Sequence, residues 1–169
     1  MPATWSISRF GLTAALSVVF LLPQNTLNNL RDRYTKESDP VRKAKLLPRL
    51  GDAEFLAVQK QLDDGDVGDA LSGVKEYRDQ AKSCVAALDA KETDPERHPS
   101  GYKQLQISLR ESLRRLDNMM AGLTGDDQKP FRSLRSDLEQ MDRHVIHELF
   151  PSQPAGESGP SKPRNRRRI

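Results

Sequence analysis

Two histidines near the end of the chain, His144 and His147, have a spacing that suits metal binding. Residues three apart on a helix share one face, so their imidazoles can reach the same ion. The segment from His144 to Glu148, however, matches neither zinc-protease pattern, H-E-x-x-H or H-x-x-E-H. A third ligand is also required, and the remaining histidine, His98, lies in an expected loop. We therefore predict no metal and no other cofactor, and name His144 and His147 as the only candidates.

A second group of potential ligands is a cluster of four aspartates within residues 63–69. A helix-loop-helix calcium site needs Gly at its sixth position and Glu at its twelfth. Counted from Asp64, these positions hold Asp69 and Lys75. The calcium pattern therefore fails, and we interpret the segment as a solvated turn whose acids cap a helix that begins near Val67.

The strongest concentration of charge lies in the C-terminal segment 151–169, which is rich in Pro, Ser, Gly and Arg. Its cations are Lys162, Arg164, Arg166, Arg167 and Arg168. With Glu157 as its one acid, this segment has a net charge of +4 against +3 for the whole chain, so the other 150 residues sum to −1. Few of its residues are apolar, so we expect a disordered tail. The near-neutral body argues against a nucleic-acid face outside the tail.

The N-terminal residues predict an export signal over residues 1–26. Arg9 precedes the uncharged run 10–22, and a polar exit follows at residues 23–25. A positive start and a short apolar run are typical of a secretory signal, but no A-x-A-like site ends the run. Two alternatives stay open: an uncleaved anchor formed by residues 10–22, or a buried first helix of a cytosolic protein. Export would place the protein in the periplasm or outside the cell.

The elements that must position these residues are helices. After a short polar helix ending near Lys36, Asp39 and Pro40 predict a helix start, with Asp39 as cap. Pro48 should kink or interrupt this helix, and Gly51 should end it before a further helix.

Apolar residues that recur at steps of three and four positions predict three longer helices after this region. The stripes are Val67, Leu71, Val74, Tyr77, Ala81, Val85 and Leu88; Tyr102, Leu105, Leu109, Leu113, Leu116, Met120 and Leu123; and Phe131, Leu134, Leu138, Met141, Val145 and Leu149. No segment alternates as a strand does. The predicted centre of the core comprises Val74, Leu109, Leu113 and Leu138. The single cysteine, Cys84, is expected to be a small core residue.

The sequence therefore predicts an all-α fold, an antiparallel bundle of about four main helices with a short helical segment before them. The predicted divisions are the signal over 1–26, the bundle over 27–150 and the tail over 151–169. We expect an exported, non-catalytic binding or scaffold protein. Anionic lipid, a cell-wall polymer or an acidic protein would bind the five tail cations. The alternative is a cytosolic or membrane-anchored helical protein whose Arg-rich tail binds nucleic acid, a partner not expected after export.

Overall fold

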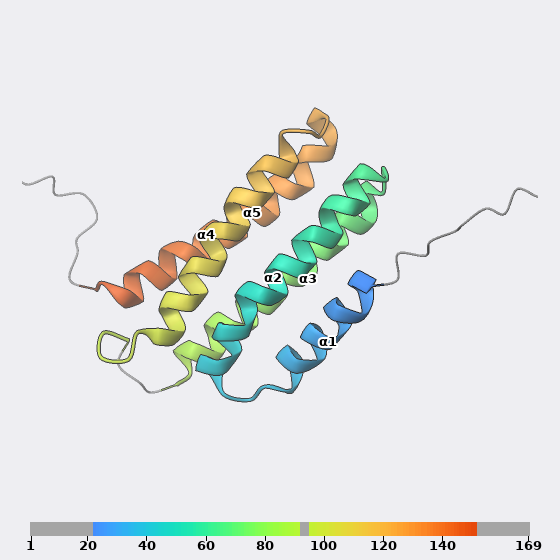
Figure 1. The fold of residues 1–169 in the computed structure, drawn as a ribbon. Coiled ribbons are helices and arrows are strands. Elements are labelled where there is room, and N and C mark those ends of the chain that lie inside the picture. The colour runs from blue at the N-terminus through green and yellow to red at the C-terminus, as the bar shows by residue number, and fades with distance from the viewer. Residues whose placement is uncertain (1–21, 92–94, 152–169) are drawn as a thin grey trace, which may run out of the picture.

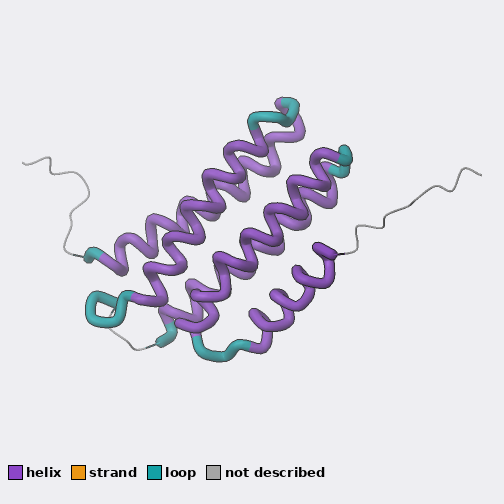
Figure 2. The backbone as a smooth tube through the Cα atoms, viewed as in Figure 1, coloured by secondary structure: helices purple, strands orange, loops and turns teal. Residues whose placement is uncertain are grey.

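A computed structural model describes residues 22–91 and 95–151, which form five α-helices and no strand (Figures 1 and 2). The helices are α1 (Leu22–Lys36), α2 (Pro40–Asp63), α3 (Val67–Asp89), α4 (Ser100–Met120) and α5 (Gly125–Leu149). The predicted all-α bundle is confirmed. Residues 1–21 and the five tail cations lie outside the described residues, and α1 begins inside the expected signal segment. None of the described helices is long and apolar enough to cross a membrane.

The bundle consists of two antiparallel hairpins, α2–α3 and α4–α5, that pack side by side (Figure 1). Helix α2 lies beside α4, and the two run parallel, since Gly101 adjoins Val41 near their starts and Arg115 pairs with Asp52 further along. Helix α3 likewise lies beside α5. The consecutive helices α3 and α4 share a smaller contact, which places them across the bundle from each other. Helix α1 packs on the outside against α2.

Helix α2 corrects the prediction of two separate helices. It continues through both Pro48 and Gly51 to Asp63. Gly51 is buried, and a Cβ placed there would lie 2.9 Å from Cε2 of Tyr77. The glycine therefore allows α3 to approach α2 closely, and it does not end the helix. The start of α2 is as predicted, because Oδ1 of Asp39 accepts a 2.8 Å hydrogen bond from the Arg42 amide.

The centre of the core is aromatic and polar as well as aliphatic. The Tyr77 and Phe55 rings meet edge to face, with centroids 5.1 Å apart. Cys84 is fully buried, as expected for a core residue, and burial raises the pKa of its thiol to about 11. Val74, Leu109 and Leu138 are also fully buried.

The inward face of α4 differs from the predicted stripe. Leu113 is only partly buried, and Ser108 and Ser112 occupy the interior. Met119 is buried, whereas Met120, which the stripe placed inside, is only partly buried. The stripe was counted on apolar residues alone, and a serine that has a hydrogen-bond partner can occupy a core position.

The turn between α2 and α3 contains Gly65, whose φ of 85° lies in the left-handed region that favours glycine. Helix α3 begins at Val67 as predicted, but the side chain of the preceding Asp66 makes no capping hydrogen bond. At this N-cap position the structure therefore lacks the side-chain cap that was expected from the acids of the turn.

Candidate functional site

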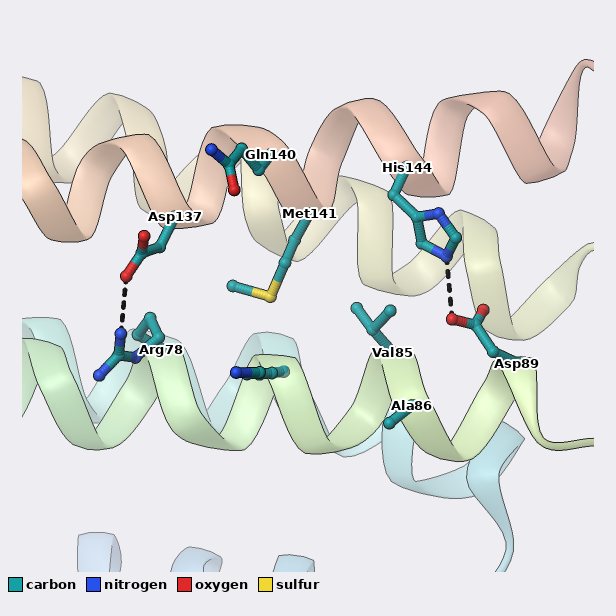
Figure 3. Close-up of a pocket in the computed structure, with 9 residues that line it drawn as sticks. Arg78, Val85, Ala86, Asp89, Asp137, Gln140, Met141 and His144 are labelled. Carbon is teal, nitrogen blue, oxygen red and sulfur yellow. Dashed lines mark hydrogen bonds and ion pairs between the residues drawn. The ribbon is translucent and has the colours of Figure 1, made fainter.

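The sequence candidate His144 lies in a groove between α3 and α5, with a volume of about 410 Å³ (Figure 3). Helix α3 supplies Arg78, Lys82, Val85, Ala86 and Asp89, and α5 supplies Asp137, Gln140, Met141 and His144. Residues at these spacings fall on one face of each helix. Two helices that run parallel therefore line the groove along its length.

An ion pair crosses the groove at one end, and a histidine–carboxylate contact crosses it at the other (Figure 3). At one end, Nη1 of Arg78 lies 2.6 Å from Oδ2 of Asp137. At the other, Nε2 of His144 lies 2.9 Å from Oδ2 of Asp89. Between them Met141 points from α5 toward α3, and Val85 stands opposite (Figure 3). Met141 and Val85 thus form an apolar part of the groove between the two contacts, where Lys82 and Gln140 also line it.

Asp89 joins three helices at one end of this groove. Its Oδ2 faces His144 on α5, and its Oδ1 accepts a 2.9 Å hydrogen bond from the Tyr102 hydroxyl on α4. Burial, together with this hydrogen bond to a carboxylate, raises the pKa of the Tyr102 phenol. The carboxylate fixes the orientation of the imidazole, as acceptor groups do for histidines generally. Asp89 and His144 remain 37% and 42% exposed, so the pair is accessible to solvent.

Asp89, and not His147, is the side chain that binds Nε2 of His144. His147 is exposed on the same helix. Within residues 22–91 and 95–151, His, Cys, Asp and Glu side chains nowhere form a group of three that could hold a metal ion. The structure therefore does not bring a third ligand to the two histidines. The contact with Asp89 could not be expected from the sequence, because the two residues are 55 positions apart.

Helix α4 carries several arginines on its outer side, and acidic side chains lie beside them. Its ion pairs are Arg114–Glu111 at 3.6 Å, Arg115–Glu111 at 3.7 Å, Arg115–Asp52, and Arg110–Asp142 at 3.9 Å. These pairs reduce the positive field that α4 presents, because each arginine lies beside a carboxylate. These contacts indicate a solvated surface with neighbouring acids.

Comparison with known protein families, with curated proteins and with solved structures finds no match for this chain. The described residues define an all-α bundle with a groove that two helices line. The function of the protein must therefore be inferred from its own residues.

Proposed function

We propose that the protein is an exported, non-catalytic helical binding or scaffold protein that its C-terminal tail holds at an anionic surface. The observation that supports this most directly is the distribution of charge. Five cations lie within residues 162–168, while residues 1–150 have a net charge of −1. The arginines of α4 lie beside acids, whereas the tail segment 151–169 has five cations and one acid in its sequence.

The non-catalytic part of the proposal draws on the α3–α5 groove. Its best candidate for proton transfer, His144, is paired with Asp89 and is open to solvent. General acid–base and nucleophilic catalysis usually use groups held in a water-restricted site with a neighbouring nucleophile or oxyanion donor. The other groove residues are Val85, Ala86, Met141, Gln140, Lys82 and the Arg78–Asp137 ion pair, and they include no hydroxyl or thiol nucleophile. Such a surface suits binding better than bond cleavage.

The tail is tested with vesicles that contain an anionic lipid, using the full chain and a truncation that lacks residues 161–169. Near an anionic membrane each cation contributes about 1 kcal/mol, an attraction that decays within a Debye length of about 8 Å at physiological salt. We expect binding at low salt, much weaker binding at about 0.15 M salt, and loss of binding on truncation. The melting temperature should not change, because no described helix includes residues 161–169. Undiminished vesicle binding by the truncated chain would contradict the proposal.

Export is tested by mass spectrometry of the N-terminus of protein recovered from its native host. Removal of residues 1–26 would also remove Trp5, the only tryptophan. The exported protein should therefore lack tryptophan fluorescence. An intact N-terminus would favour the anchored or cytosolic alternative, in which the arginine tail binds nucleic acid, and a salt-dependent gel shift with the full chain would then identify that partner.

A further inference from the structure

A second cavity, of about 450 Å³, lies among α1, α2 and α3, away from the residues that line the α3–α5 groove. On α3, its lining includes Asp69, Gly73 and Glu76, which follow one another at helical-turn spacing. Helix α2 contributes Glu54 and Val58 at the same kind of spacing. The three helices therefore form an elongated site that runs along the axis of α3.

One end of this cavity has an excess of negative charge. Two carboxylates, Glu54 and Glu76, share the guanidinium of Arg31: Nε lies 3.0 Å from Oε1 of Glu54, and Nη2 lies 2.7 Å from Oε2 of Glu76. With both acids ionised, the three groups sum to −1. Glu54 is only 1% exposed, so its charge acts through a medium that screens less than water does.

The buried carboxylate is also incompletely hydrogen-bonded. Oε1 of Glu54 accepts from both Arg31 and Gln80, the latter at 2.9 Å. Oε2 has no hydrogen-bond partner among the described residues. A buried polar atom without a partner is uncommon in folded proteins and is a recognised sign of an additional bound group.

The opposite end of the cavity carries a separate acid, Asp69. It precedes Glu76 by seven residues on α3, which places the two positions about 10 Å apart along the helix axis. Between these ends the lining includes Val58 and Gly73, with the polar side chains of Gln61 and Ser72 beside them. A Cβ placed at Gly73 would lie 2.8 Å from Cγ2 of Val58, so the two helices are in close contact there.

The geometry points to a linear aliphatic polyamine as the ligand of the α1–α2–α3 cavity. One terminal ammonium group would donate to the Glu54 and Glu76 carboxylates, and the other would donate to Asp69. The methylene chain would lie along Val58 and Gly73. An anion is disfavoured by the net charge. A single divalent metal ion would not bridge the two ends, because the positions of Asp69 and Glu76 lie about 10 Å apart along the helix axis and metal–oxygen bonds are only about 2–2.6 Å long.

The probe is spermidine, titrated by calorimetry at low salt into the full chain. The variants Asp69→Asn and Glu76→Gln each neutralise one end of the site. The matched control is Asp32→Asn, which removes an equal charge from an exposed position of α1 outside the cavity lining. Circular dichroism and the melting temperature of each variant report whether it folds, and Asp69→Asn suffices if Glu76→Gln does not fold.

We expect one saturable site for spermidine. Each variant at the site should weaken binding about tenfold, the equivalent of one lost charge-assisted hydrogen bond, and Asp32→Asn should not change it. Butylamine, which has a single ammonium group and cannot pair with both ends, should bind about tenfold more weakly. The absence of saturable binding below about 1 mM spermidine would overturn the inference. An equal loss in Asp32→Asn would also overturn it, since the attraction would then be diffuse. These results are independent of the vesicle test, which depends on the tail.

Discussion

The hydroxyl of Tyr77 on α3 lies 2.9 Å from Oγ of Ser108 on α4, and both side chains are buried. Oγ of Ser112, one turn further along α4, donates to the Ser108 carbonyl oxygen at 2.8 Å. Burial raises the pKa of the Tyr77 phenol to about 12, so the group is neutral at physiological pH. The two serines thus supply the hydrogen bonding that a buried phenol requires.

Replacing this phenol tests the polar contact within the core. Tyr77→Phe leaves Oγ of Ser108 without its interhelical partner, which should lower the free energy of unfolding by about 1–3 kcal/mol. Urea denaturation of Tyr77→Phe, Ser108→Ala and the double variant measures the coupling. We expect the two losses to be less than additive. Strict additivity would mean that the two groups do not interact.

Gly51 and Gly68 form a matched pair of helical glycines with opposite expected effects. At Gly51 an added Cβ meets the fully buried Tyr77 ring at 2.9 Å, so Gly51→Ala should destabilise the protein by roughly 1–3 kcal/mol. At Gly68 nothing lies within 4 Å of such a Cβ, so Gly68→Ala should stabilise it by up to about 1 kcal/mol. Thermal unfolding compares the two. Equal shifts in melting temperature would contradict the close approach of α3 to α2.

Leucine truncations distinguish the true inner face of α4 from the one expected from sequence. Leu109 and Leu138 are fully buried, so Leu→Ala at either position should lower the free energy of unfolding by about 2–5 kcal/mol. Leu113 is only partly buried and should lose about 1 kcal/mol. Chemical denaturation gives all three values. A loss at Leu113 as large as that at Leu109 would show that α4 is rotated relative to this structure.

The contact between Arg31 on α1 and the Glu54 carboxyl on α2 should make the stability of the protein depend on pH. Burial raises the pKa of this carboxyl above its ordinary value of 4.5, against hydrogen bonds from Gln80 and Arg31 that lower it. An acid with a raised folded-state pKa binds protons more tightly when folded. The favourable contribution of Glu54 to the free energy of unfolding is therefore complete below the unfolded-state pKa. It is lost as pH rises through the folded-state pKa.

Arg31→Ala removes the guanidinium that pairs with Glu54, which offsets part of the stability lost when Glu54 ionises. The variant should therefore be close to the wild type in stability near about pH 4 and clearly less stable near about pH 8. Urea denaturation at both pH values measures the difference. Arg42→Ala, which removes a more exposed arginine paired with Glu37, is the control and should show a small, nearly constant effect. A pH-independent loss in Arg31→Ala would contradict the role of Glu54.

The sequence by itself determined the helical class and most of the buried apolar positions. Periodic apolar residues such as Val74 and Leu138 identify an inner face because helical spacing is a local property of the chain. The Asp39–Pro40 start could be predicted for the same reason, since a cap involves residues only a few positions apart.

Only the tertiary structure decided which helices became neighbours and what their polar residues contact. Gly51 lies inside α2 against the Tyr77 ring of α3, and the buried Ser108 hydroxyl lies beside the Tyr77 phenol. The pairing of His144 with Asp89 likewise requires α3 and α5 to lie side by side. These relationships join residues 26 to 55 positions apart, and local periodicity carries no information at that separation.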